Sequence, residues 1–174
     1  MPLKEIKHFS VSNLQVLDEL GNVDQELVPT LEDSELLELY HAMVFAREAD
    51  QRMIKLQRQG RLGTFAPSTG QEATICSSVY AMKEQDWFVG TYRELGGRLI
   101  RGEPLEKTLL YYNGYEEGSH FPKNPRTLPT QVILGSQLCH AVGIAYAMQN
   151  LDEKETAVVA FFGDGASSQG DFHE

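Results

Sequence analysis

The sequence predicts an α/β fold, in which helices flank a parallel sheet, for a single domain that follows an N-terminal arm. Segments with the apolar spacing of amphipathic helices alternate with short strand-like runs over the 174 residues. The apolar run TAVVAFF at 156–162 is typical of a parallel strand that is covered on both faces. It leads directly into Gly163-Asp164-Gly165, and ligands of such folds bind beyond the carboxyl ends of the strands.

Composition and charge exclude several classes of protein. The formal net charge of −10 argues against a nucleic-acid binder, because such proteins use Lys and Arg to neutralise phosphates. No apolar run approaches the roughly 20 residues that a membrane span needs, so no membrane association is expected. The start, MPLKEIKH, lacks the apolar region of a secretory signal, so a cytoplasmic location is expected. The two cysteines, Cys76 and Cys139, fit no metal-binding spacing and are expected to be buried free thiols.

Residues 1–30 are predicted to form an N-terminal arm, and residues 31–174 the first part of the domain. A turn signal at Gly21 and Asn22 lies between short apolar runs, which favours a small hairpin over residues 14–23. Two strands alone are marginally stable in water, so the arm is expected to lie on another surface.

Periodicity and capping residues define the expected helices and strands. A long helix is expected to begin at Asp33 or Ser34, whose side chains can cap it, and to end at Gly60. Pro104 can open a later helix at its first position, where its missing N–H costs nothing. The other expected helices cover 71–83, 104–112 and 136–151, and the expected strands cover 86–89 and 156–162.

Two stretches are too rich in glycine, proline and small polar residues for regular structure. They cover residues 63–70 and 114–129, and the second includes Pro122, Pro125 and Pro129. Loops of this length are often functional.

The Gly163-Asp164-Gly165 turn has the features of a diphosphate site. Its glycines allow a phosphate to approach the backbone closely, and a helix that follows would present free N–H groups. Ser168 and Asp171 offer a capping box for that helix. Asp164 adds a carboxylate, which Mg²⁺ bound to phosphate prefers as a ligand. Gly-Asp-Gly alone is equally typical of a plain turn, so the interpretation depends on its context.

Four stretches in register give that context. AVVAFFGDGASSQGDFHE resembles the opening of the thiamine diphosphate motif in the α subunits of 2-oxo acid dehydrogenases, which begins with Gly-Asp-Gly. DQRMIKLQRQGRLGTFAPSTGQEA, VGTYRELGGRLIRG and QVILGSQLCHAVGIAYA are similar to further segments of these subunits, in the same order. The resemblance covers nearly the whole chain and implies a thiamine diphosphate-binding fold. It also implies that the chain is the N-terminal half of such a subunit, truncated after Gly-Asp-Gly.

The resemblance implies which residues hold the diphosphate and its metal ion. Tyr92 and Arg93 stand at the family's Tyr-Arg pair, which contacts the diphosphate, and an arginine can bind two phosphate oxygens at once. Without the family match, Arg93 would more often form a surface ion pair and Tyr92 would more often be a core aromatic. Asp164 matches the Mg²⁺ ligand. Backbone contacts to the diphosphate fall at Gly163, Gly165 and Ala166.

Other positions match the rest of the cofactor site. Val132 and Leu134 match the loop that supports the aminopyrimidine ring, with Leu134 as the apolar wedge that keeps the cofactor bent. Ser136 and Gln137 match positions that hold a structural K⁺ in some relatives. Phe65 falls where relatives line the substrate entrance, although simple packing of its loop is an equally good interpretation.

No catalytic residue is expected within the 174 residues. The family's Asn metal ligand and its substrate-binding His fall beyond Glu174, and the Glu that activates the cofactor comes from the β subunit. The chain alone is therefore expected to bind the cofactor poorly and to be inactive. The histidines match no catalytic position in the family: His8, His41, His120, His140 and His173.

The implied reaction is the oxidative decarboxylation of a 2-oxo acid, with pyruvate as the first candidate, and transfer of the acyl group to a lipoyl-bearing acyltransferase core. The implied assembly is a heterotetramer of α and β subunits, and the small-residue face around Gly143 is an interface candidate. A branched-chain 2-oxo acid dehydrogenase and an acetoin dehydrogenase are alternatives within the same resemblance. An assembly or phosphate-binding module without enzyme activity is a further alternative. A nucleotide-binding P-loop is less favoured, because Gly-x-x-x-x-Gly-Lys does not occur.

Overall fold

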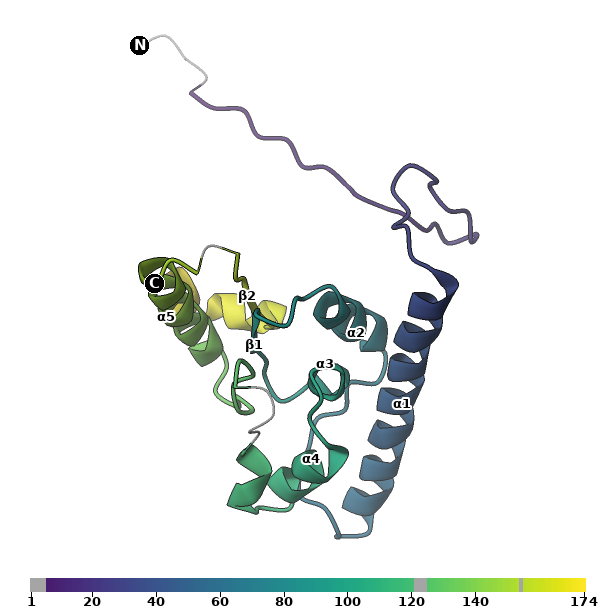
Figure 1. Ribbon diagram of the computed structural model, residues 1–174, viewed down its shortest axis with the longest axis vertical. Coiled ribbons are helices and arrows are strands. Elements are labelled where there is room, and N and C mark those ends of the chain that lie inside the picture. Colours follow the sequence, from purple (N-terminus) through teal and green to yellow (C-terminus); the bar gives the residue numbers. More distant parts are fainter. Residues whose placement is uncertain (1–5, 121–124, 154) are drawn as a thin grey trace.

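The computed structural model describes residues 6–120, 125–153 and 155–174, and helices make up most of its regular structure (Figure 1). In chain order the elements are α1 (Asp33–Arg58), α2 (Glu72–Tyr80), β1 (Trp87–Val89), α3 (Leu95–Ile100), α4 (Leu105–Tyr112), the 3-10 helix η1 (Glu116–Ser119), α5 (Ser136–Asn150), β2 (Val158–Ala160), the 3-10 helix η2 (Asp164–Ser168) and α6 (Gly170–His173). Helices combined with a small parallel sheet confirm the predicted α/β class.

α1 begins with a capping box made by two glutamates. Glu32 is the N-cap residue, and its backbone N–H donates to the Glu35 carboxylate at 2.9 Å. The expectation that Asp33 or Ser34 caps this helix is therefore wrong, because the Glu32 and Glu35 side chains each reach the other's free backbone N–H. The helix ends where it was expected to end, before a left-handed Gly60 with a φ of 70°.

The core lies where α1 packs against α2 and α3. Ala46 and Cys76 are fully buried there, and a Cβ added to Gly96 of α3 would lie 2.6 Å from the Cys76 Sγ. Glycine at this position therefore permits the close approach of α3 to α2. A second buried cluster joins α1, the loop after it and α3: Ala49, Met53, Leu62, Phe65 and Leu95.

β1 and β2 are parallel neighbours, as the sequence predicts, and they form a two-stranded sheet among the described residues. Trp87 lies beside Val158, and Val89 lies beside Ala160. α5 packs beside β2, but all three residues of β2 remain only half-buried. The expectation that β2 is covered on both faces is therefore wrong for the described residues. Parallel pairing nevertheless brings the carboxyl ends of both strands to one edge of the sheet.

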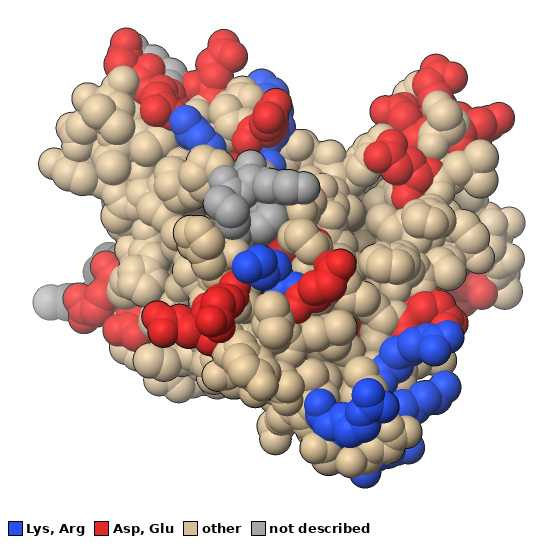
Figure 2. All heavy atoms as spheres, turned by 60° about the horizontal axis from the view of Figure 1, so that its bottom comes forward, with Lys and Arg blue, Asp and Glu red and all other residues tan. Residues whose placement is uncertain are grey.

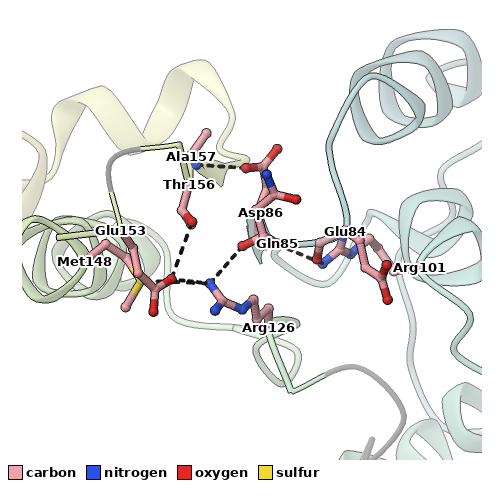
Figure 3. A network of polar contacts seen from close by, with 9 residues as sticks. All are labelled: Glu84, Gln85, Asp86, Arg101, Arg126, Met148, Glu153, Thr156 and Ala157. Atoms are coloured by element: carbon pink, nitrogen blue, oxygen red, sulfur yellow. Dashed lines mark hydrogen bonds and ion pairs between the residues drawn. The ribbon is translucent and has the colours of Figure 1, made fainter. Parts of the chain in front are cut away.

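Polar contacts join the α5–β2 part of the chain to the segments around β1 (Figure 3). Arg126 donates to the carbonyl of Gln85 and to the Glu153 carboxylate, at 2.9 Å in each case. On the other side of β1, Arg101 donates to the Asp86 carbonyl at 2.8 Å. These side chains fix the approach to β1 from two directions.

The N-terminal arm forms the expected hairpin only as a single antiparallel bridge between Leu17 and Val23. Gly21 has a φ of 85°, and the Asp18 carboxylate accepts the N–H of Asn22 at 2.7 Å, so this turn is held locally. The arm runs away from the helical body (Figure 1), and no surface on which it lies is found among the described residues. The division into an arm and a domain therefore stays a prediction.

Other expectations about the surface have mixed outcomes. Cys76 is buried as expected, but Cys139 is exposed, because the described residues leave its side of α5 uncovered. The stretch 114–129 contains η1, and Pro122 lies outside the described residues, as do the first five residues of the start MPLKEIKH. Within the described parts of the chain, no helix is long and apolar enough to cross a membrane.

Charged side chains are unevenly distributed over the surface. On the face drawn in Figure 2, acidic side chains form several groups, whereas basic side chains gather mainly over the C-terminal end of α1. Lys55 and Arg58 in the last turn of α1 complement the negative end of the helix dipole.

Candidate functional site

A cavity of about 480 Å³ opens where β1 and β2 end. Seven of the eight positions predicted to contact the cofactor line it, although they come from three separate stretches of the sequence. They meet because parallel strands deliver the turns that follow them to the same edge of the sheet. The lining residues are Gln71, Thr91, Tyr92, Arg93, Glu94, Leu134, Phe162, Gly163, Asp164, Gly165 and Ala166.

The turn after β2 brings an exposed carboxylate and two glycines to this cavity. The Asp164 Oδ1 accepts the backbone N–H of Gly165 at 2.9 Å. Neither Gly163 nor Gly165 has a positive φ, and a Cβ added to either residue would meet nothing within 4 Å. Nothing among the described residues therefore requires glycine here, and the missing side chains leave the backbone open toward the cavity.

The expected helix start after this turn is displaced along the chain. Asp164 to Ser168 form the 3-10 helix η2, and α6 begins later, at Gly170, with Gln169 as its N-cap residue. The predicted capping box between Ser168 and Asp171 is therefore wrong, because Ser168 ends η2 instead of preceding α6.

The turn after β1 brings Tyr92 and Arg93 to the opposite wall. The Arg93 Nη1 donates to the carbonyl of Pro67 at 2.8 Å, and its guanidinium carbon lies 5.6 Å from the centre of the Tyr92 ring. The Tyr112 hydroxyl donates to the carbonyl of Tyr92 at 2.7 Å, and burial raises the pKa of that hydroxyl. The sequence left a surface ion pair open for Arg93 and a core position open for Tyr92. In the structure, Arg93 bonds to a backbone carbonyl and half-buried Tyr92 lines the cavity.

The loop before α5 contributes one apolar side chain to the cavity. Leu134 is 45% exposed and lines the cavity, whereas Val132 is 60% exposed and does not. Gly135 follows with a φ of 91°, a left-handed conformation that turns the chain into α5. Val132 is thus the one predicted cofactor position that lies outside the cavity wall.

Gln137, in the first turn of α5, carries an unsatisfied buried acceptor. Its side chain is fully buried, and its Nε2 donates to the carbonyl of Phe161 at 3.0 Å. Its Oε1 has no hydrogen-bond partner among the described residues. The neighbouring Ser136 hydroxyl donates to the carbonyl of Ile133 at 2.8 Å. A buried oxygen without a donor is a suitable ligand for a cation.

Comparison with known proteins decides the family. The family model described as "Dehydrogenase E1 component" matches residues 40–174. The chain belongs to the dehydrogenase E1 component family. It is 43% identical over 162 residues to a protein of Staphylococcus aureus named pyruvate dehydrogenase E1 component subunit alpha. The aligned residues make up 92% of this chain and 44% of that protein. A protein of the same name from Staphylococcus epidermidis is 41% identical over the same length. The E1 chain thus spans less than half the length of these relatives.

Four residues of the cavity wall in this E1 chain had not been singled out from the sequence: Gln71, Thr91, Glu94 and Phe162. Thr91 and Glu94 flank the Tyr92-Arg93 pair, and Phe162 precedes Gly163. Their position beside recognised motifs was the signal that could have pointed to them.

Phe65 does not share the cavity with the other predicted residues. Its side chain is 8% exposed and packs edge-on to Tyr112, with ring centres 5.6 Å apart. It also belongs to the buried cluster with Met53 and Leu95. These contacts are the loop packing that the sequence left open, and a role at the substrate entrance stays a prediction.

The E1 chain has a larger apolar hollow, of about 770 Å³, between α1 and the α3–α4 segment. Phe45 and Leu105 are among its lining residues, but neither a glycine-rich strand end nor an arginine is among the described residues of its wall. The smaller cavity is the better candidate because the Arg93 guanidinium and the open backbone of Gly163 and Gly165 can bind an anion. No histidine lines that smaller cavity, and the described residues contain no cluster of three or more His, Cys, Asp or Glu suited to a metal ion.

Proposed function

We propose that this chain holds thiamine diphosphate at the carboxyl ends of β1 and β2, as part of a 2-oxo acid dehydrogenase that acts on pyruvate. The observation that carries the proposal is the shared cavity, in which the Tyr92-Arg93 turn faces the Gly163-Asp164-Gly165 turn. Family membership and the similarity to proteins named pyruvate dehydrogenase E1 component subunit alpha support it.

The residues present fit the diphosphate end of the cofactor. The Arg93 guanidinium can bind two phosphate oxygens at once. The backbone of Gly163 and Gly165 is open to a close ligand, since a Cβ at either position would meet no neighbour within 4 Å. Half-exposed Leu134 would support the ring of the cofactor from the α5 side. When bound, the cofactor supplies the group that adds to the carbonyl of a 2-oxo acid and takes up the electrons released as carbon dioxide leaves.

Two cations belong to this proposal. Asp164 would hold Mg²⁺ beside the diphosphate, because a hard cation prefers carboxylate oxygens. The remaining ligands of the Mg²⁺ ion would come from other groups. The unsatisfied Gln137 Oε1, with Ser136 beside it, would take part in a K⁺ site. The orphaned acceptor is the feature of this chain that fits such an ion.

Partners complete the proposed enzyme. The group that activates the cofactor would come from a β subunit in a heterotetramer, and the acyl product would pass to a lipoyl-bearing acyltransferase core. A cytoplasmic location is part of the same proposal. The face of α5 around Gly143 is an interface candidate, because a Cβ there would meet nothing within 4 Å and Tyr146 on this helix is 67% exposed.

The experiment is a decarboxylation assay on the enzyme assembled with its β subunit. Ferricyanide reduction that depends on thiamine diphosphate and Mg²⁺ is measured with pyruvate and with 3-methyl-2-oxobutanoate. Faster turnover of pyruvate is expected. Preference for 3-methyl-2-oxobutanoate would move the assignment to a branched-chain enzyme, and activity with acetoin alone to an acetoin dehydrogenase. An assembly that binds no thiamine diphosphate would overturn the proposal and leave an assembly module.

A further inference from the structure

A buried carboxylate closes the turn that carries Tyr92 and Arg93. Thr91 and Glu94 are each 7% exposed. The Glu94 Oε2 accepts the backbone N–H of Thr91 and also its hydroxyl, the latter at 2.8 Å. One side chain therefore ties together the two ends of the four-residue turn, and the pair between them lines the cavity.

The Glu94 carboxylate also packs tightly against the end of β1. A Cβ added to Gly90 would lie 2.7 Å from the Phe88 Cζ and 3.3 Å from the Glu94 Oε2. Phe88 is fully buried and cannot easily move aside. The Glu94 carboxylate therefore lies close to the Gly90 backbone, with little free space between Gly90 and the Phe88 ring.

Two further contacts hold the turn from outside. The Tyr112 hydroxyl of α4 fixes the carbonyl of Tyr92, and the carbonyl of Pro67 accepts from Arg93. Neither contact fixes Thr91, which is held by Glu94. The two hydrogen bonds from Thr91 to Glu94, called here the Thr91–Glu94 clamp, therefore hold the backbone conformation of the turn that carries Arg93.

We propose that Glu94, acting through Thr91, is a positioning residue that aims Tyr92 and Arg93 at the diphosphate. The inference rests on the proposed function. A guanidinium binds two phosphate oxygens only when its plane is correctly oriented, so affinity for the diphosphate depends on this clamp. Glu94 is itself an acid in the wall of an anion site, where its charge alone would weaken binding.

The two possible effects of Glu94, through its charge and through its geometry, change the affinity for diphosphate in opposite directions. Glu94→Gln removes the repulsive charge and keeps only one acceptor oxygen for Thr91. If Glu94 acts by its charge alone, the variant binds diphosphate more tightly. If Glu94 positions the turn, the variant binds more weakly. Thr91→Val removes the hydroxyl without any change of charge, and Thr91→Ser restores it.

The chain offers a matched control in a second buried Thr–Glu pair. The Thr108 hydroxyl donates to the Glu103 Oε1 at 3.1 Å, and both residues are buried but lie outside the cavity wall. Thr108→Val therefore removes an equivalent hydrogen bond at a distance from the site. Thermal unfolding of every variant is recorded first, so that a general loss of stability is separated from a loss of affinity.

The assembled enzyme with its β subunit is titrated by calorimetry with thiamine diphosphate in Mg²⁺ and, separately, with Mg²⁺ and inorganic pyrophosphate. Thr91→Val and Glu94→Gln are expected to bind both ligands roughly tenfold more weakly, while Thr91→Ser and Thr108→Val stay within about twofold of the wild type. Wild-type affinity in Thr91→Val, or tighter binding by Glu94→Gln, would overturn this inference alone. A wild-type assembly that binds neither ligand would overturn the proposed function as well.

Discussion

Asp86 and Ala157 are joined across 71 residues of sequence by a hydrogen bond in which the Asp86 Oδ1 accepts the backbone N–H of Ala157 at 2.8 Å (Figure 3). The other carboxylate oxygen of Asp86 accepts the N–H of Lys83 at 2.7 Å. Asp86 precedes β1 and Ala157 precedes β2, so one carboxylate sets the register of the parallel pair from its amino end. The cavity at the opposite end of the pair depends on that register.

Asp86→Ala is expected to lower the free energy of unfolding by about 2–3 kcal/mol, because two backbone N–H groups lose a charged acceptor. Asp86 is 6% exposed, so water cannot easily replace the carboxylate. The measurement is urea unfolding of the chain. Glu84→Ala, which changes an exposed side chain two residues away, is the control and should stay within about 0.5 kcal/mol of the wild type. Equal effects of the two substitutions would contradict the role of Asp86.

Gly97 and Gly143 should respond in opposite directions to the same substitution. A Cβ added to Gly97 in α3 would lie 2.8 Å from the Val79 Cγ2 and 3.3 Å from the Phe88 Cε2. Overpacking is therefore expected to make Gly97→Ala destabilising by about 1–3 kcal/mol. A Cβ on Gly143 in α5 would meet nothing within 4 Å, so Gly143→Ala should stabilise the chain by up to about 1 kcal/mol through helix propensity. Urea unfolding of both variants checks this. Stabilisation by Gly97→Ala would contradict the tight packing of α3, and destabilisation by Gly143→Ala would contradict the open space beside α5.

Asp164→Asn separates a ligand role from a structural one. Asp164 is exposed, and its carboxylate accepts the N–H of neighbouring Gly165, which an asparagine oxygen can also accept. Stability should therefore change by less than about 0.5 kcal/mol. In the assembled enzyme, Mg²⁺-dependent binding of thiamine diphosphate should weaken by at least roughly tenfold, because a hard cation loses a carboxylate. Asp171→Asn, in α6 and outside the cavity wall, is the calorimetric control. Unchanged affinity in Asp164→Asn would remove Asp164 from the metal site.

Local sequence signals predict much of this architecture. The apolar run at 156–162 and the shorter one at 86–89 correctly predict two strands, and β-strand character followed by Gly-Asp-Gly correctly predicts a parallel edge with a cavity. Each of these patterns lies within a few consecutive residues, so it can be recognised without knowing which distant segments pack against it. Motif resemblance then adds Tyr92 and Arg93, which have no distinguishing local pattern of their own.

Contacts between distant segments explain what the sequence does not predict. Helix α3 is missing from the expectation because Gly96 and Gly97 lower helix propensity, yet close packing against Cys76 and Val79 favours glycine there. The unsatisfied Gln137 acceptor is visible only once Phe161 and α5 are placed together. The Thr91–Glu94 clamp likewise depends on side-chain direction, which spacing alone does not give.

Stability should fall in acid through Glu72, whose carboxylate accepts from Arg47 and from the N–H of Gly70. The hydrogen bond from Arg47 lowers the pKa of Glu72 from 4.5 to about 2. Because the folded pKa lies below the unfolded one, the folded state binds fewer protons between these values. The stabilising contribution is therefore complete above pH 4.5 and is lost as the pH falls toward 2.

Glu72→Gln removes this titration, so the free energy of unfolding of the wild type should fall by about 1–2 kcal/mol more than that of the variant between pH about 5 and about 2. The figure is modest because the Arg47 side chain is 44% exposed and water screens the pair. Urea unfolding at a series of pH values measures the difference. Glu48→Gln, an exposed glutamate on the same helix as Arg47, is the control and should follow the wild-type pH dependence. Parallel curves for the wild type and Glu72→Gln would show that the Arg47–Glu72 pair contributes nothing to the acid sensitivity of the fold.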